Sequence, residues 1–304
     1  MIIVAILKHV AGKSADYGAA LDYLKYEHDE VLKRPLLDAN GNWVLRRDIL
    51  LEGINCEPEL FDVECEMLNA QYHKNQNYDE IKTHHYLISF DPADKDECGL
   101  TGEQAQAIGM EYVKANFPGH QALVCTHMDG HNGSGNIHVH IVINSLRKLN
   151  VPQQPFMERP IDCKAGYKHH LTKDYLKHLQ QSLMNICMRE SLNQVDLLSP
   201  SVNKITQQEY YAKQRGQINL DKLNAELIAE GFTPMKTKFQ TEKDKLRDSI
   251  TAAAKKAKSF EEFSRLLQTE SNILVKDHRG RFSYLLPDRE KYISARTLGT
   301  SFDR

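Results

Sequence analysis

The chain has 304 residues, 41% of them hydrophobic, and a formal net charge of −2 at pH 7. This length can bury a sizeable core and make one large or two modest domains. The sequence contains no apolar run near 18 residues and no signal-peptide pattern, which argues against membrane insertion, and we expect a soluble, cytoplasmic protein. Its six cysteines form no C-x-x-C pair, a pattern typical of reduced thiols.

Hydrophobic periodicity predicts helices and strands that alternate along the chain. The expected helices are 14–28, 58–75, 101–116, 169–190, 206–215, 220–230, 241–258 and 260–269. The expected strands are 2–10, 85–91, 122–128, 137–146, 273–276 and 282–286. We predict an α+β fold in which the strands before residue 150 form an antiparallel sheet with helices packed on one face, a two-layer sandwich. A small C-terminal unit of two helices and a hairpin should follow, so we divide the chain into 1–235 and 236–304.

Three tyrosines lie on the first predicted helix, which Ser14 can cap. Tyr17 shares a helical face with apolar residues and is expected in the core. Tyr23 and Tyr26 lie on the other face at i, i+3 spacing. By itself the pattern predicts nothing more than packing for these rings.

The strand predicted at 85–91 has two different faces. Tyr86, Ile88 and Phe90 make its apolar face, and His85 lies on the opposite one. If this strand lies beside the histidine-rich segment farther along the chain, His85 could act there as a proton acceptor or phosphate contact. A histidine facing solvent at the start of a strand is the alternative, and the sequence leaves both open.

The segment 126–144, THMDGHNGSGNIHVHIVIN, is the most informative part of the chain. From Ile137 apolar residues alternate with His138, His140, Val142 and Asn144, so one strand face builds core and the other carries polar groups. A Gly-rich loop before it can reverse the chain as a wide hairpin. His127 and His138 would then be near-opposite partners, with His140 within about 7–8 Å diagonally.

Three imidazoles that converge in this way predict a site for a divalent metal ion with open positions for substrate oxygens. The carboxylate of Asp129 lies in the same loop, and His131 is a rival to His127 as the first ligand. A lone H-x-H pair in a chain with 14 histidines would be weak evidence. The third histidine across the hairpin makes the metal site the favoured interpretation.

These residues resemble the third motif of the relaxase/mobilisation nuclease family, conjugative nickases of the HUH endonuclease superfamily. The matching letters are His127-Met-Asp129 and Asn136-Ile-His138-Val-His140-Ile-Val-Ile-Asn144. Relatives in that family carry a nucleophilic tyrosine in a Y-[LI] step on the first helix, and Tyr23-Leu24 fits this step. The segment Lys291–Gly299 also resembles the family's closing region, and the chain's last residues suggest a nuclease-domain fragment.

The resemblance implies a DNA relaxase that nicks one strand at an origin of transfer. Tyr23 would form a 5′-phosphotyrosyl link and leave a free 3′-hydroxyl, a reversible transesterification. It implies catalytic roles for Tyr23, Asp129 and His85, and a metal held by His127, His138 and His140. Mg²⁺ or Mn²⁺ is the expected working ion, while Zn²⁺ or Ni²⁺ can bind more tightly in vitro. The implied partners are origin DNA, as single strand with adjacent duplex or hairpin, and accessory and coupling proteins of a conjugation system.

Two other functions remain open at this point. A rolling-circle replication initiator would place its tyrosine on a helix after the H-x-H strand, where Tyr175 lies. The helix of such initiators normally carries a second tyrosine or a lysine four residues away, but here these positions are Leu171 and Leu179, so the pattern fits poorly. A non-catalytic, metal-stapled DNA-binding module could close its site with Cys125, which shares a strand face with His127.

The basic residues are concentrated in the C-terminal third. Residues 201–304 contain 20 Lys and Arg against 14 Asp and Glu, whereas the preceding part carries a net charge of −8. This asymmetry predicts a phosphate-tracking surface, with a solvated helix face as the alternative. The expected DNA-binding residues are Asn144, Arg147, Lys236, Lys238, Lys243, Lys255, Lys256, Arg279 and Arg281.

Overall fold

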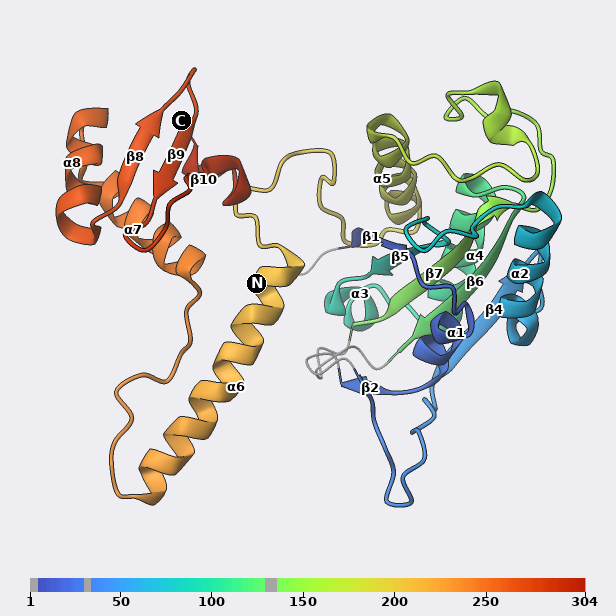
Figure 1. Cartoon of the computed structure of the whole chain (residues 1–304), viewed down its shortest axis with the longest axis horizontal. Helices are drawn as coiled ribbons and strands as arrows, with labels where there is room; N and C mark the ends of the chain where they lie inside the picture. The colour runs from blue at the N-terminus through green and yellow to red at the C-terminus, as the bar shows by residue number, and fades with distance from the viewer. Residues whose placement is uncertain (1–4, 30–33, 129–135, 304) are drawn as a thin grey trace. The chain divides into compact units, whose positions relative to one another are not determined.

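The computed structural model describes residues 5–29, 34–128 and 136–303 (Figure 1). The chain divides into two compact units, Met1–Leu198 and Ser199–Arg304. No helix among these described residues is long and apolar enough to cross a membrane.

A five-stranded sheet forms the centre of the first unit. Its strands, in spatial order, are β1 (Ile6–Gly12), β5 (Thr83–Ser89), β7 (His138–Arg147), β6 (His120–His127) and β4 (Ile49–Ile54). Every neighbouring pair is antiparallel. The histidine-rich strand β7 is therefore central in the sheet. The strand β5 lies directly beside it, which is the arrangement under which His85 was expected to reach the histidines.

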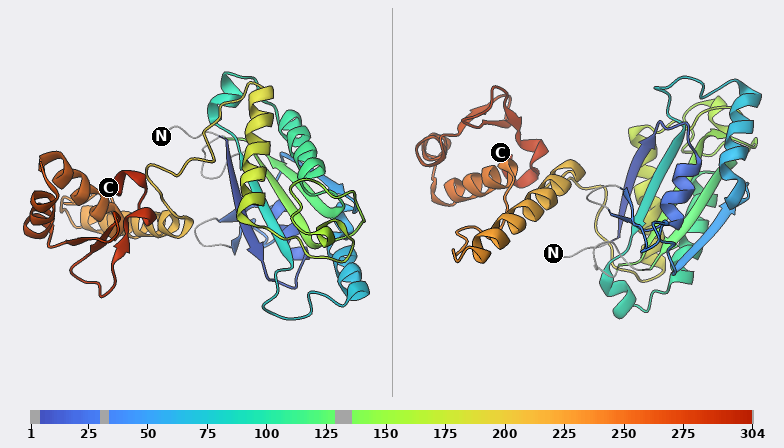
Figure 2. Two further views of the ribbon diagram at one scale, coloured as in Figure 1. Left: turned by 90° about the horizontal axis from the view of Figure 1, so that it is seen from above. Right: turned by 60° about the horizontal axis from the view of Figure 1, so that its bottom comes forward.

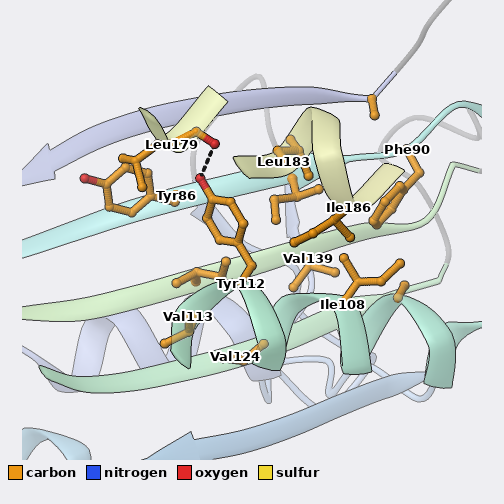
Figure 3. Close-up of a cluster of buried hydrophobic side chains, with 14 of the residues drawn as sticks. Tyr86, Phe90, Ile108, Tyr112, Val113, Val124, Val139, Leu179, Leu183 and Ile186 are labelled. Carbon is orange, nitrogen blue, oxygen red and sulfur yellow. Dashed lines mark hydrogen bonds between the residues drawn. The ribbon is translucent and has the colours of Figure 1, made fainter. Parts of the chain in front are cut away.

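Two helices cover one face of this sheet. They are α4 (Gly102–Asn116) and α5 (Lys173–Arg189), and with the apolar faces of β5, β6 and β7 they enclose the main hydrophobic core (Figure 3). The Tyr112 hydroxyl donates to the Leu179 carbonyl at 3.0 Å and joins the two helices. Gly109 allows α4 to approach the sheet, because an added Cβ would lie 2.6 Å from Val139 Cγ1.

Helices also lie on the opposite face, as Figures 1 and 2 show. There α1 (Gly18–Lys25) and α2 (Phe61–Tyr72) pack on a smaller core that includes Leu24, Phe61 and Leu123. The predicted α+β class with an antiparallel sheet is confirmed, and α1 and α2 add a partial layer that the sequence analysis did not anticipate. This layer places α1 over the polar face of β7.

Short elements complete the first unit. They are β2 (His28–Asp29), β3 (Arg34–Pro35), α3 (Pro92–Asp96) and the 3-10 turns Pro58–Leu60 and Pro160–Cys163. The edge strand β4 was missed from the sequence, because its letters, ILLEGI, show no alternation between apolar and polar residues. Its pairing with β6 makes β6 an internal strand.

The second unit has its own core. It contains α6 (Gln207–Ala229), α7 (Glu242–Lys256), α8 (Phe260–Ser271), the sheet strands β8 (Leu274–Asp277), β9 (Phe282–Leu285) and β10 (Ile293–Ser294), and the 3-10 turns Ala295–Thr297 and Thr300–Phe302. The expected two helices and hairpin are present as α7, α8 and β8–β9. The break predicted between helices 206–215 and 220–230 is wrong, because the two segments form one continuous helix. Gly216, within this helix, packs against Phe239.

A buried ion pair ties α6 to α7. Arg247 and Glu209 are both buried and hydrogen-bonded, and Arg247 Nη2 donates to the Lys204 carbonyl at 2.6 Å. The predicted division at residues 235 and 236 therefore falls inside the second compact unit. Which of its residues make up a DNA-binding extension stays a prediction.

A group of buried histidines lies beside the aromatic end of the main core. His84 and His169 meet edge to face at 4.6 Å between ring centroids, and His169 Nε2 lies 2.9 Å from the Tyr86 hydroxyl. His120 Nδ1 donates to the Asn144 carbonyl at 2.9 Å. Desolvation by burial lowers the pKa of His84 and of His120 to about 3, and places that of His169 well below its ordinary value.

We expect these histidines to make the fold sensitive to acid. The unfolded chain binds protons on His84 and His120 near pH 6.5, whereas the folded chain does so only near pH 3. The contribution of these two groups to stability is therefore fully present above pH 6.5 and is lost as the pH decreases through that window. Each such group contributes a slope of up to about 1.4 kcal/mol per pH unit. Denaturant titrations at several pH values measure it, with His84→Gln as the comparison. An identical slope in that variant would contradict the assignment.

Candidate metal centre and active site

Three histidines meet on the polar face of the central strands. His127 on β6 lies opposite His138 on β7 in the strand register, and His140 follows two residues along. All three side chains are buried, and one ligand nitrogen from each lies within 4.8 Å of the others. The predicted cross-strand pairing of His127 with His138 is confirmed.

The strand pleat explains why these side chains converge. Ile137, Val139, Ile141 and Ile143 all belong to the main core on the α4 and α5 side. The alternating residues must then point to the other face. Burial of the apolar set therefore fixes the register of β7 and, with it, the placement of His138 and His140.

Backbone carbonyls fix the protonated nitrogen on two of the rings. His127 Nε2 lies 2.9 Å from the Leu24 carbonyl and His138 Nδ1 lies 3.3 Å from the Asn136 carbonyl. Because a carbonyl only accepts, these nitrogens donate, which assigns the lone pair to Nδ1 of His127 and Nε2 of His138. A hydrogen bond from the second nitrogen to a carbonyl is the usual way a metal-binding imidazole is oriented.

His85 gives the third ring its orientation. Its Nε2 lies 2.9 Å from His140 Nδ1, across the β5–β7 pair. If His140 donates this hydrogen bond, its Nε2 carries the lone pair that a metal needs. Of the two alternatives that the sequence left open for His85, the structure shows the one in which His85 lies at the cluster. There it contacts a candidate metal ligand.

Tyr23 is the tyrosine of α1 that faces this cluster. Its ring centroid lies 5.6 Å from that of His140 and 6.0 Å from that of His85, both edge to face. The Tyr23 side chain is partly buried. The phenol therefore lies beside the two linked histidines.

The other tyrosines have different surroundings. Tyr17 is buried, its hydroxyl is hydrogen-bonded to Asn69 at 2.7 Å, and burial raises its pKa to about 12. Its expected place in the core is confirmed. Tyr26 packs against Trp43 at 5.3 Å between centroids. Tyr175 is buried with its hydroxyl bonded to the Asn116 carbonyl, and desolvation raises its pKa, which removes support from the rolling-circle interpretation.

His28 is a member of this neighbourhood that sequence reasoning missed. Its ring centroid lies 5.2 Å from that of Tyr23, and its Nδ1 donates to the Tyr26 carbonyl at 2.9 Å. A neutral His28 therefore holds its lone pair on Nε2. The two-residue strand β2 that carries it has no periodicity that could have identified it, and its spacing of five from Tyr23 was the only available signal.

The residues present fit a divalent metal ion. Three imidazoles with second nitrogens held by Leu24, Asn136 and His85 form a donor set that suits an ion bound at about 2.1 Å, with positions left for substrate oxygens. Cys125 does not belong to the potential ligand group among the described residues. It is buried in the α1–α2 core, where desolvation raises its pKa to about 12. A closed structural zinc site built with this thiol is therefore not favoured.

Some predicted site residues lie elsewhere. Asp129 and His131 fall outside the described residues. Asn144 is fully buried. Its side-chain Nδ2 donates to Gln121 Oε1 at 3.0 Å, and its side-chain Oδ1 accepts from the Leu146 N–H. Arg147 is also buried, and desolvation lowers its pKa. Burial gives no support to the prediction that Asn144 and Arg147 bind DNA, which stays a prediction. The alternation that predicted β7 does not show that this strand is covered on both faces.

The basic residues of the second unit are mostly on its surface. Among the residues expected to bind DNA, the exposed ones are Lys236, Lys238, Lys255, Lys256, Arg279 and Arg281. Lys256 makes an ion pair with Glu270 at 2.9 Å, and the partly buried Lys243 makes one with Glu209 at 3.3 Å. The remaining exposed cations have the placement that phosphate contact requires.

The chain is similar to known relaxases. The family described as "Relaxase: MobA/VirD2-like, nuclease domain" matches residues 44–151, a range that begins after Tyr23 and contains the three-histidine cluster and His85. Two proteins from Staphylococcus aureus, each named Protein rlx, are 26% and 21% identical over 263 and 252 residues. The aligned regions cover 86% and 83% of this chain, and 68% and 63% of those proteins, so the chain spans about two thirds of these relatives.

Solved structures of TrwC also match at low similarity. One is described as the conjugative relaxase TrwC in complex with oriT DNA, in a metal-bound form, with 12% identity, a TM-score of 0.33, and coverage of 88% of this chain and 98% of that chain. Another is TrwC complexed with a 27-mer DNA that comprises the recognition hairpin and the cleavage site, with 12% identity, a TM-score of 0.35, and coverage of 86% and 98%.

Proposed function

We propose that the protein is a conjugative or mobilisation relaxase, because residues 44–151 match the family model of the MobA/VirD2-like relaxase nuclease domain. In this proposal it nicks one DNA strand at an origin of transfer by transesterification through Tyr23. The observation that carries the proposal is the position of the Tyr23 ring, 5.6 Å from a ring of the buried three-histidine cluster. A tyrosine beside a metal-binding set is what phosphodiester transesterification needs.

The covalent step exchanges one phosphoester for another. The Tyr23 oxygen attacks the scissile phosphorus, a Tyr–O–P bond forms, and the bond from phosphorus to the 3′ oxygen of the preceding nucleotide breaks. The phenol loses its proton to a base and the departing 3′ oxygen gains one, so no water or oxidant is consumed. Since the phosphoester bond is kept, the 3′-hydroxyl can attack in turn and rejoin the strand.

The chain's own residues prepare this step. A free tyrosine has a pKa near 10, so attack at neutral pH needs a proton acceptor. Two groups are candidates: Asp129, from the family motif, and His28, whose Nε2 holds the lone pair. His85 orients His140 through their 2.9 Å hydrogen bond. A bound ion, with Mg²⁺ or Mn²⁺ as the expected one, would polarise the scissile phosphate and offset the charge that develops on its oxygens.

A denaturing-gel assay tests this function. The protein is incubated with labelled single strands from origin-of-transfer sequences of its source element, with Mn²⁺ or with a chelator. We expect a covalent protein–DNA species in the presence of metal, and its reversal when an oligonucleotide with a free 3′-hydroxyl is added. Cleavage without any covalent species would indicate a hydrolytic nuclease and contradict the proposal.

The second unit should hold DNA beside the nick through its exposed cations. We expect the triple variant Lys255→Gln, Arg279→Gln, Arg281→Gln to bind an origin hairpin more weakly and with a flatter dependence on salt. Each lost phosphate contact should reduce the slope of log K against log salt by about 0.7–0.9. Fluorescence anisotropy between low and moderate salt measures it. The control is Lys177→Gln, an exposed lysine of α5, and equal slopes in both variants would show a solvated face.

A further inference from the structure

An exposed aromatic face lies next to the helix that carries Tyr23. It belongs to a small hairpin that we call the finger, residues 26–28 and 34–47 (Figure 1, blue, below β2). Leu37 lies opposite Trp43, and Tyr26 opposite Leu45, in its two antiparallel bridges. Trp43 is 44% exposed, Leu37 60% and Leu45 55%, so the finger presents one indole ring and two leucine side chains to solvent.

The finger is internally well bonded. Its backbone is joined by hydrogen bonds from Glu27 to Val44, from Leu36 to Glu27 and from Val44 to Leu36, at 2.8 to 3.0 Å. At the tip, the Asp38 carboxylate accepts from the N–H groups of Asn40 and Asn42, and Gly41 takes a φ of 83° that suits glycine. Such a hairpin can hold Trp43 in one place.

One perpendicular ring contact holds Trp43, and 44% of the residue is exposed. The Tyr26 ring meets it at 5.3 Å and 83°, and the Tyr26 carbonyl is held by Arg46 Nε at 3.1 Å and by His28 Nδ1 at 2.9 Å. Tyr26 follows Tyr23 by three residues, so the exposed ring lies within a few nucleotides' length of the nucleophile. Arg34 and Arg47 are exposed at the base of the finger.

We propose that Trp43 is a stacking platform for a base of the single DNA strand that leads to Tyr23. This inference rests on the proposed function, because it supplies a binding contact for the same strand. A rigid, half-exposed indole with arginines at its base has the two features of single-strand binding sites, a ring on which a base stacks and cations that contact the backbone. Stacking does not depend on base identity, so the contact should be tolerant of sequence.

The protein contains a single tryptophan, so its fluorescence reports on this position alone. The probes are a 20-nucleotide oligo(dT) and an abasic strand of equal length and charge, both in a chelating buffer. We expect oligo(dT) to quench Trp43 emission and the abasic strand to leave it unchanged. The Kd for labelled oligo(dT), measured by anisotropy, should rise about five- to 150-fold in Trp43→Ala and stay near wild type in Trp43→Phe.

The control is Tyr78→Ala, which removes an aromatic ring that is 93% exposed outside the finger and should leave the Kd unchanged. Circular dichroism checks that each variant is folded. Unchanged emission with oligo(dT), or an unchanged Kd in folded Trp43→Ala, would overturn the proposal. The exposed face of the finger would then be better explained as a binding surface for a protein.

Covalent adduct formation at saturating origin DNA should survive Trp43→Ala. If the wild-type protein forms no covalent adduct but oligo(dT) still quenches its Trp43 emission, the proposed function is refuted and the stacking proposal stands.

Discussion

Replacing His138 or His140 by alanine should abolish metal-dependent cleavage while the protein stays folded. Each imidazole supplies one of three nitrogens that lie within 4.8 Å of one another. With two ligands left, the ion should be lost or misplaced, and its stabilisation of charge on the phosphate, worth several kcal/mol, goes with it. We expect the rate of adduct formation to fall on the order of a thousandfold.

Calorimetric titration with Mn²⁺ separates metal binding from chemistry in these variants. The matched control is His178→Ala on α5, whose half-buried ring stacks on Phe156. It should bind metal and form adduct like the wild type. Full activity of His138→Ala or His140→Ala in chelated buffer would show that the cluster is not a metal site.

Tyr23→Phe should eliminate the covalent adduct and still bind DNA. The substitution removes one hydroxyl, the proposed nucleophile, and leaves every cationic phosphate contact in place. The ring that packs beside His140 and His85 is also retained, so the fold and the metal affinity should change little. Gel-shift and adduct assays on the same substrate measure the two properties separately.

Two neighbouring tyrosines make informative controls for that variant. Tyr26→Phe keeps its contact with Trp43 and should form adduct normally. Tyr17→Phe loses a buried hydrogen bond to Asn69 and should lower stability without loss of chemistry. An adduct that persists in Tyr23→Phe and disappears in Tyr26→Phe would overturn the assignment of the nucleophile.

The sequence predicted the centre of the site because strand alternation is a strong local signal. The apolar residues at 137, 139, 141 and 143 determine which face of β7 is buried in the main core, and His138 and His140 follow from it. The pairing of His127 with His138 needed only a hairpin that joins consecutive strands. The family resemblance then selected Tyr23 from the three tyrosines of the predicted helix 14–28.

What the sequence did not reveal depends on contacts between distant segments. The edge strand β4 is defined by its pairing with β6, and His28 reaches Tyr23 through a turn without periodicity. Asn144 and Arg147 were expected to bind DNA, but both are buried in the folded chain. Local patterns give the face of a strand, whereas the cover on that face is a tertiary property.

The central claim is that Tyr23 becomes joined to the 5′ phosphate of a nicked strand. The most direct measurement is mass spectrometry of the trapped adduct, first on the intact protein and then on its peptides after digestion of the DNA. We expect one added nucleotide remnant, on the peptide that contains Asp22-Tyr23-Leu24, and none after chelation. A remnant on Tyr26, on Tyr175 or on a histidine would contradict the account.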